Sequence, residues 1–523
     1  MSGSQGSGRP VSAHGDNEQP ASQEGPIDSS DASNHSTVAP ERDDAQPSKK
    51  EKNVETTRPK LGGSGGHMSR SEYYGKRRHQ RGTVDDKWHV WHSEIRSTVI
   101  EALKKAVIAF GSITIWMWVC LPIFFGSTYT LESYFPNMTV HLINFDTTTG
   151  ASSVLGPAMV DMANMQMTLP RSSTHLGWQL RPASQYPNGL DSVRQDILSQ
   201  ASWACVTVNA NATSAYLTAL ENGDASYNPT GAISIWFQSA RFYQITLLYI
   251  QPLLISNVES ALTMARQQAY QAFITANANN ATAIQLAAQV PQALGTTFSY
   301  NIQDLRSIPS NAWGAAAPME AGLVFFVIFA FYICLYGGIS RMKSGLQNRL
   351  TWRSMIGLRL GWPIFAYFWM SLWQTCVIRA FQVPLNTTIG RAGFFVLWML
   401  NWFTIICAGL AMETVLAIVG IPFLPFFLIF WIVMNITSSF FPIELMPDFY
   451  HFFRWFPFVQ NVQAYKIITF GTDLTHRLGL HFGVLFAIMA VEFVCFPLAI
   501  TFERWKLDSG KLKEMREKEE KKE

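Results

Sequence analysis

Few residues of this chain have the type and position to do chemistry, and the first of them is Glu492. It lies well inside the apolar run LGLHFGVLFAIMAVEFVCFPLAI, residues 478–500. A charged carboxylate is costly in lipid, so such residues usually face the interior of a helix bundle or a water-filled cavity. We predict that Glu492 faces the interior, where it would carry a proton in a proton-coupled exporter. The alternative is a neutral glutamic acid that bonds to a neighbouring helix or reaches the inner headgroups, because Glu503 and Arg504 follow a few turns later.

No catalytic set is recognisable among the remaining residues. His141 and His175 are the only histidines of the long hydrophilic segment 128–318, and neither belongs to a nucleophile motif such as G-x-S-x-G. Five of the six cysteines lie in apolar runs, Cys205 stands alone, and no C-x-x-C metal spacing occurs. We therefore predict no enzyme, no metal and no cofactor.

Helices that cross a membrane are the elements that must position these residues. The chain is 48% hydrophobic and only 15% charged, and its net charge of +3 does not indicate a nucleic-acid partner. A hydrocarbon core takes about 20 apolar residues to cross as a helix. The run from residue 392 to 434 is about twice that length and holds a single acid, Glu413. We predict two spans folded back at Glu413, which would then face the cytosol.

The other apolar runs complete the predicted fold class, an α-helical polytopic membrane protein with an inserted α+β extracytoplasmic domain. Two prolines, Pro422 and Pro425, are expected to kink the fifth span. The six predicted spans are residues 106–126, 321–339, 360–378, 392–412, 414–437 and 478–500.

Basic residues set the predicted orientation, with both termini in the cytosol. Residues 1–83 have the composition of a disordered cytosolic tail, residues 84–105 that of an amphipathic elbow helix on the inner surface, and residues 503–523 that of a charged cytosolic tail. Loops rich in lysine and arginine stay in the cytosol. The loop after the second span contains five bases and no acid: Arg341, Lys343, Arg349, Arg353 and Arg359.

The segment 128–318 is the predicted extracytoplasmic domain. It contains no lysine, and it holds three sequons for glycosylation, at Asn137, Asn211 and Asn280. Its pattern is α+β, with a helical region at 253–290. Strands are predicted at Val140–Phe145, Ala204–Val208 and Ile233–Phe237.

The segment 438–473 is too aromatic for a free loop and too polar for a span. It reads SSFFPIELMPDFYHFFRWFPFVQNVQAYKIITFGTD. We predict short interfacial or re-entrant helices at the outer surface, broken at Pro442, Pro447 and Pro457.

The order of these parts resembles the membrane domain of ABC type-2 exporters, which also carries an outer P-x-E-x-x-P segment, here Pro442-Ile-Glu444-Leu-Met-Pro447. Residues 203–233 and 440–472 are similar to the fungal nitrosoguanidine-resistance membrane proteins. The resemblance implies a fungal plasma-membrane protein tied to drug and mutagen resistance, acting as an export permease or affecting lipid asymmetry, and it implies a homodimer. It also suggests that Glu444 shapes an outer gate; the alternative is that Glu444 caps a short helix.

The energy source is restricted by a missing motif. An ATP-driven pump needs a phosphate-binding G-x-x-x-x-G-K-[ST] loop, and neither Gly75-Lys76-Arg77 nor Gly510-Lys511-Leu512 has the upstream glycine or the hydroxyl residue. ATP coupling would therefore need a separate ATPase subunit.

Two hypotheses remain: an export permease or export component for small amphiphiles or lipids, and a non-transporting membrane scaffold or regulator that acts through its extracytoplasmic domain.

The predicted topology is tested by glycosylation. If Asn137, Asn211 and Asn280 lie outside the cytosol, at least one of them should carry a glycan, because each begins an acceptor sequon. Glycosidase treatment should then increase the gel mobility of the chain. Protease protection that places residues 128–318 on the cytosolic side would contradict the whole topology.

Overall fold

The computed structural model describes residues 89–147, 153–308, 316–473 and 477–520. By its internal contacts the chain divides into residues 1–88 and 89–523, and the description below concerns the second unit. The predicted tail at 1–83 and the first residues of the predicted elbow lie outside the described residues.

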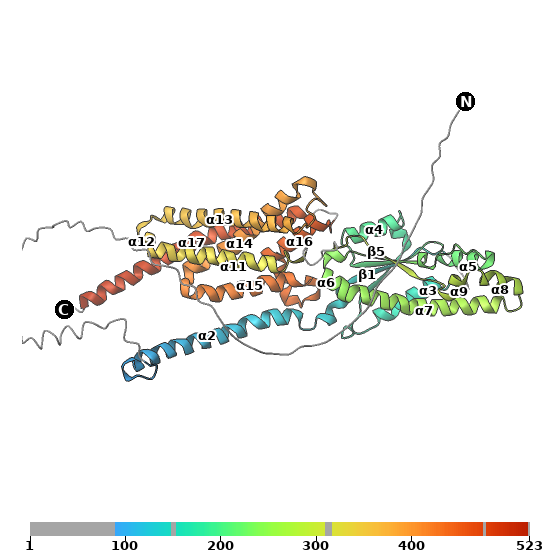
Figure 1. Cartoon of the computed structure of the whole chain (residues 1–523), viewed down its shortest axis with the longest axis horizontal. Helices are drawn as coiled ribbons and strands as arrows, with labels where there is room; N and C mark the ends of the chain where they lie inside the picture. Colours follow the sequence, from blue (N-terminus) through green and yellow to red (C-terminus); the bar gives the residue numbers. More distant parts are fainter. Residues whose placement is uncertain (1–88, 148–152, 309–315, 474–476, 521–523) are drawn as a thin grey trace, which may run out of the picture. The chain divides into compact units, whose positions relative to one another are not determined.

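Seven long helices form the apolar part of the chain (Figure 1). Helix α14 occupies the centre of this bundle, because it packs against α11, α13, α15, α16 and α17. Its buried residues surround it on all sides, as expected for a helix without a polar face. The seven helices are α2 (Arg96–Thr128), α11 (Ala321–Lys343), α13 (Trp352–Ala380), α14 (Gly393–Val419), α15 (Leu424–Phe440), α16 (Pro457–Phe470) and α17 (Leu478–Glu520).

Six helices of the described residues are long and apolar enough to cross a membrane, so the chain is a polytopic membrane protein. Five of them, α2, α11, α14, α15 and α17, overlap predicted spans. The sixth covers Tyr243–Ala276 and is not a predicted span. Helix α13 contains the predicted span 360–378 but is not among the six, because tryptophans and Gln374 dilute its aliphatic residues.

The predicted turn at Glu413 is wrong. Helix α14 continues through Glu413 to Val419, and the chain reverses at Gly420 and the short 3-10 helix Ile421–Phe423. Gly420 has a φ of 83°, a conformation that residues with a side chain rarely adopt. Pro422 and Pro425 lie in the first turns after this reversal, where proline fits a helix, so they do not kink α15 as predicted.

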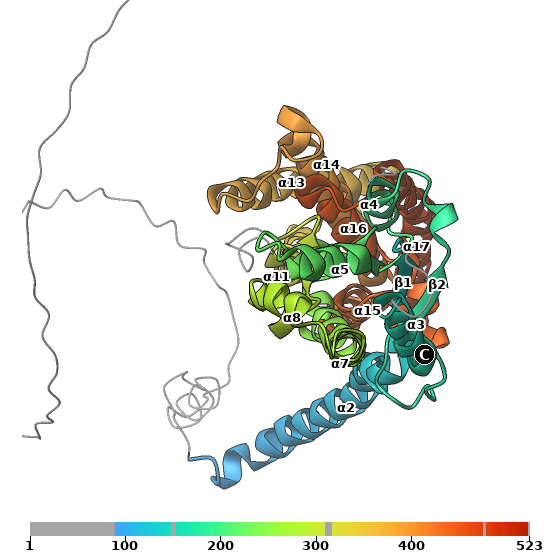
Figure 2. The same ribbon diagram turned by 90° about the vertical axis from the view of Figure 1, so that its right-hand side faces the viewer.

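The predicted boundary between an elbow helix and the first span is also absent. Helix α2 runs without interruption from Arg96 to Thr128, and within residues 89–95 it is preceded by the 3-10 helix Ser93–Ile95. The sequence EALKKAVIAF contains no helix breaker, so nothing separates the two predicted elements. In both Figure 1 and Figure 2, α2 lies at the edge of the bundle beside α15, and the Trp116 indole donates a hydrogen bond to the Phe426 carbonyl of that helix (2.8 Å).

The aromatic segment breaks at the three predicted prolines. Short 3-10 helices at Ile443–Leu445 and Asp448–Trp455 follow Pro442 and Pro447, and α16 begins at Pro457. Helix α16 is buried among α14, α15 and α17 rather than at an interface. Amide and hydroxyl groups hold it there: Asn461 donates to Thr404 (2.9 Å) and to Asn401 (3.2 Å) of α14. Such hydrogen bonds between helices stabilise packing where water is excluded.

A five-stranded mixed sheet lies between α2 and α11 in the sequence. Its order is β2-β1-β3-β4-β5, with β1 parallel to β2 and β3, β3 antiparallel to β4, and β4 parallel to β5. Strands β3 and β4 have the predicted bounds, and β1 begins and ends one residue earlier than predicted. The strands are β1 (Thr139–Asn144), β2 (Gly177–Arg181), β3 (Ala204–Val208), β4 (Ile233–Phe237) and β5 (Tyr300–Asp304).

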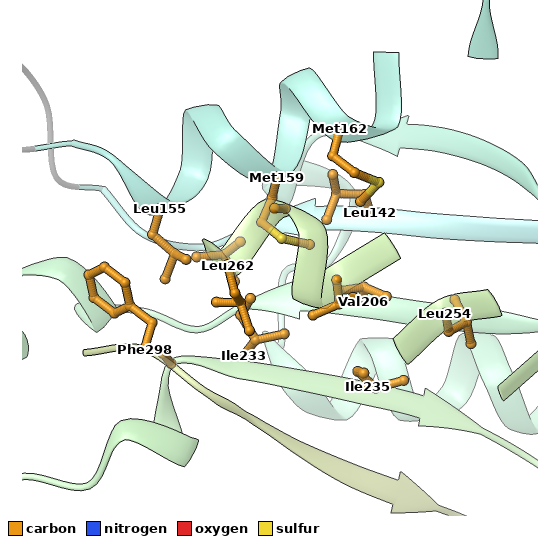
Figure 3. Packing of buried hydrophobic residues seen from close by; sticks show 14 of the residues in the cluster. Leu142, Leu155, Met159, Met162, Val206, Ile233, Ile235, Leu254, Leu262 and Phe298 are labelled. Atoms are coloured by element: carbon orange, nitrogen blue, oxygen red, sulfur yellow. The ribbon is translucent and has the colours of Figure 1, made fainter. Parts of the chain in front are cut away.

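Helices cover both faces of this sheet. On one face α3 (Leu155–Met167) and α7 (Gln251–Ala276) enclose a core that includes Leu142, Val206 and Ile235 (Figure 3). On the other face α4 (Leu190–Leu198) packs over Ile143 and Cys205. The apolar residues of α7 thus pack against the sheet, and this contact explains their hydropathy without a membrane. The remaining helices are α5 (Ala212–Asn222), α6 (Tyr243–Ile245), α8 (Ala281–Ala288), α9 (Pro291–Gly295) and α12 (Leu346–Arg349).

Candidate functional site

A polar cavity of about 190 Å³ lies where the sheet-bearing segment meets α16 and α17; we call it the junction cavity. Glu444, one of the two predicted site residues, lines it. The other residues that define the cavity here are Gln200, Trp203, Arg241, Phe242, Arg454, Gln463, Asp473, Arg477 and His481.

The chain around Glu444 is held from both sides. Asn137 donates a hydrogen bond from Nδ2 to the Glu444 carbonyl oxygen (2.8 Å). The next side chain, Leu445, is fully buried in the core on the α3 and α7 face of the sheet. Pro442 and Pro447 restrict the backbone on either side. The backbone of Glu444, a half-buried residue, is therefore held at the wall of the cavity.

Arg241 is the cation that faces Glu444. Its Nη1 donates to the Ser202 carbonyl (2.8 Å), and its guanidinium lies 3.7 Å from the centre of the Trp203 ring. Burial lowers the pKa of Arg241 to about 10, although Glu444 and Asp473 favour the charged form. Arg241 therefore stays protonated at neutral pH.

Lys466 of α16 lies beside the cavity and is almost completely buried. Its Nζ is 3.2 Å from the centre of the Phe242 ring and has no hydrogen-bond partner within the described residues. Burial, and then repulsion by Arg241, holds the pKa of Lys466 well below that of an exposed lysine.

The charges of the junction cavity fit a polar headgroup. Arg241, Arg454 and Arg477 are cationic, and Glu444 and Asp473 are acidic. Guanidinium groups bind phosphate and carboxylate through paired hydrogen bonds, and the acids accept hydrogen bonds from an amine. His481 of α17 contributes a ring whose Nδ1 is 2.8 Å from the Gln460 Oε1.

A second polar group lies further along the bundle, and sequence reasoning missed it. We call it the buried charge cluster, formed by Arg341, Arg359, Glu413 and Glu503. Arg359 binds Glu413 Oε2 through Nη2 (2.9 Å) and Glu503 Oε2 through Nη1 (2.5 Å), and Arg341 lies 3.4 Å from Glu413. Glu413 is completely buried and Arg359 nearly so.

This cluster corrects two predictions. Glu413 does not face the cytosol at a turn, because it is paired inside the bundle. Arg341 and Arg359 do not lie in a loop after the second span but in α11 and α13, where acids from α14 and α17 pair with them. The sequence held one signal of this arrangement, since a lone acid in a long apolar run usually has a partner on another helix.

Glu492, the other predicted site residue, lies between these two groups rather than at the junction cavity. It is half-buried, and its Oε2 is enclosed with no hydrogen-bond partner within the described residues. His481, Glu492 and Glu503 follow each other at intervals of eleven residues on α17. Eleven residues are about three turns and about 16 Å of helix, so these three side chains lie on nearly the same side of α17. We call them the α17 row.

The three sequon asparagines are all exposed. The Asn137 side-chain amide donates a hydrogen bond to the Glu444 carbonyl, and Asn280 accepts a hydrogen bond at Oδ1 from the Ala283 amide (3.1 Å). Asn211 precedes α5 with a φ of 59°. An attached glycan leaves Oδ1 and one amide hydrogen in place, so these contacts do not prevent glycosylation.

Comparison with known proteins matches the chain to a family and to curated relatives, one of them from yeast. The family described as "Protein of unknown function (DUF3533)" matches residues 111–494. The chain is 25% identical over 333 residues to an uncharacterized endoplasmic reticulum membrane protein, YJR015W, of Saccharomyces cerevisiae, which covers 61% of this chain and 62% of the relative. The chain thus spans less than two thirds of that relative's length. No solved structure matches. The resemblance to nitrosoguanidine-resistance proteins and to ABC type-2 exporters stays a prediction.

Removal of the Glu413 side chain should destabilise the bundle strongly. Glu413→Ala leaves Arg341 and Arg359 buried beside one remaining acid, and breaking a buried ion pair costs about 3–5 kcal/mol. Glu101→Ala is the matched control, because Glu101 forms an exposed pair with Lys105 (2.8 Å) and such pairs contribute about 0–1 kcal/mol. The measurement is the thermal unfolding midpoint of the purified chain in detergent. Equal midpoints for the two variants would contradict a stabilising role for the cluster.

Proposed function

We propose that this chain, which belongs to the DUF3533 family of proteins of unknown function, is an export permease or export component that moves a small amphiphile across its membrane. The single observation that carries the proposal is the junction cavity, which places fixed charges beside the end of an apolar helix bundle. A scaffold that only binds partners through its surface has no need for buried charges at this position. The proposed role is transport, without covalent chemistry.

The headgroup of the amphiphile is the part that the junction cavity would bind. Arg241 and Arg454 offer donors to a phosphate or carboxylate, and Glu444 offers an acceptor to an amine, while Arg477 and Asp473 pair with each other (3.8 Å). The proposed substrates are therefore lipids or toxic amphiphiles with an anionic or zwitterionic head. Their apolar tails would stay in the surrounding membrane lipid while the head passes along the bundle.

The orientation follows the sequence prediction as part of this proposal. The sheet and its helices would form the extracytoplasmic α+β domain, and both termini would lie in the cytosol. Helix α13, the third span in order, would bring the number of spans to six, and Tyr243–Ala276 would not be a span. ATP coupling would require a separate subunit, and a homodimer is the proposed assembly.

The membrane would be the plasma membrane, as the resemblance implies. The name of the yeast relative places that protein in the endoplasmic reticulum. Localisation of the tagged chain decides between these two membranes.

Glu444 is the residue whose charge tests headgroup binding. The full chain is reconstituted alone into phosphatidylcholine vesicles that contain a fluorescent phosphatidylethanolamine, and the rate at which the label crosses the bilayer is measured. We expect Glu444→Gln to lower this rate about tenfold or more, because a hydrogen bond to a charged group contributes about 1.5–3 kcal/mol. Asp448→Asn is the matched control, since the Asp448 side chain is fully exposed in the same segment. In cells, Glu444→Gln should reach its membrane normally and lose resistance.

Two outcomes would contradict these proposals. If Glu444→Gln leaves the rate of lipid crossing unchanged, Glu444 does not shape an outer gate. A wild-type rate no faster than that of protein-free vesicles favours the second hypothesis, a scaffold or regulator that acts through the sheet-bearing segment.

The α17 row supports coupling of export to protons. His481 lines the junction cavity, Glu503 belongs to the buried charge cluster, and Glu492 lies between them on the same side of the helix. We propose that Glu492 takes up and releases a proton during each transport cycle.

The Glu492→Gln variant separates this role from a structural one. Gln preserves a neutral hydrogen-bonding group and abolishes protonation, so we expect the variant to fold, to reach the membrane and to lose the pH dependence of transport. The measurement is flux in the same vesicles at several pH values, with Glu492→Asp as the control that keeps a titrating acid. Full flux with full pH dependence in Glu492→Gln would show that Glu492 carries no proton.

A further inference from the structure

We propose that His141, Asp196 and Cys205 form a Zn²⁺ site beneath α4, on the face of the sheet opposite α3 and α7. The inference is independent of any transport role. It also revises the sequence prediction that the chain has no metal site, which rested on the absence of closely spaced ligand motifs.

The sheet register brings two of the three ligands together. His141 and Cys205 are Cα partners in the parallel pair β1 and β3, so their side chains leave the sheet side by side and on the same face. Helix α4 packs over this face and supplies Asp196. These ligands are 55 and nine residues apart in sequence, so only the folded sheet assembles them.

The distances between the donor atoms fit a tetrahedral ion. The His141 Nδ1 lies 3.0 Å from the Asp196 Oδ2, the Cys205 Sγ lies 3.3 Å from the same oxygen, and all three donor atoms lie within 4.8 Å of one another. Zn²⁺ binds nitrogen and oxygen at about 2.0–2.2 Å and sulfur at about 2.3 Å, so its ligand atoms are about 3.3–3.6 Å apart. Ion binding would therefore lengthen the two contacts to Oδ2 by a few tenths of an ångström, and it would bring Nδ1 and Sγ, which lie within 4.8 Å of each other, to tetrahedral spacing.

The surrounding residues are those of a metal site rather than of a catalytic nucleophile. Ser202 donates to the Asp196 Oδ2 (2.7 Å), and a hydrogen bond of this kind orients a metal-binding carboxylate. The Tyr186 hydroxyl lies 3.3 Å from the His141 Nδ1 and would give way when that nitrogen binds the ion. Cys205 is completely buried, so its sulfur is not accessible to a substrate. A nucleophilic triad also requires the two nitrogens of the histidine to bond to different partners, whereas here Cys205 and His141 converge on one carboxylate oxygen.

A thiolate, a carboxylate and a neutral imidazole are together a ligand set that suits a divalent cation. Zn²⁺ would displace the thiol proton and any proton on His141 Nδ1 to solvent and would bind the resulting thiolate, the neutral imidazole and the carboxylate.

The first test is the metal content of the full chain, purified in detergent without chelator and then dialysed against zinc chloride and against metal-free buffer. We expect about one Zn²⁺ per chain, because one such three-ligand group occurs among the described residues. Cys205→Ser and Asp196→Asn should lose the ion. Cys495→Ser is the matched control, because it makes the same substitution at an exposed cysteine of α17 and should keep the full content.

The second test uses Ser202→Ala, which removes a hydrogen bond to Asp196 but no ligand. Loss of such a partner typically weakens metal binding by about 10–100-fold, and competition with a chromophoric chelator measures this change. Wild-type protein loaded with Co²⁺ should also show a thiolate-to-cobalt absorption band. If the wild-type chain binds neither Zn²⁺ nor Co²⁺ after dialysis, the three side chains form only a hydrogen-bonded cluster and the proposal is wrong, whether or not the variants fold.

Discussion

The pairing of Glu413 with Arg359 is the interaction on which the arrangement of the helices depends. Glu413 lies in the central helix α14 with no exposed surface, and an isolated charge there would cost more than the helix packing around it could offset. Its partners come from α11 and α13, and Glu503 of α17 completes the set. Two acids and two arginines thereby link four helices. The reversal at Gly420 follows from the same constraint, because an earlier turn would move Glu413 out of reach of both arginines.

Two polar regions result, and one helix connects them. The junction cavity lies beside the sheet-bearing segment, and the buried charge cluster lies further along α14 and α17. The α17 row has a member in each region and Glu492 between them. Close packing also joins α14 to α13, because Gly409 of α14 lies against the Tyr367 ring of α13, where a Cβ atom would approach that ring to 2.3 Å.

The sheet contributes to the cavity through the backbone around Ser202. The Ser202 carbonyl accepts the hydrogen bond from Arg241 at the cavity wall, and the Ser202 hydroxyl donates to Asp196 in the cluster beneath α4. One residue thus contacts both sites. An ion bound by His141, Asp196 and Cys205 would fix α4 and this stretch of backbone, and would so hold Arg241 in the position where it faces Glu444.

The sequence by itself determined what depends on local patterns. Alternating and β-branched residues placed β3 and β4 at their observed bounds, long apolar runs located five of the six span candidates, and the three prolines fixed the breaks in the segment 438–473. Tertiary structure decided the rest, because it depends on which distant residues meet. Arg359, a partner of Glu413, lies 54 residues before it in sequence. No local pattern shows so distant a partner, and the lone acid therefore suggested a turn. His141 and Cys205 become neighbours only through the register of β1 and β3, which no local spacing encodes.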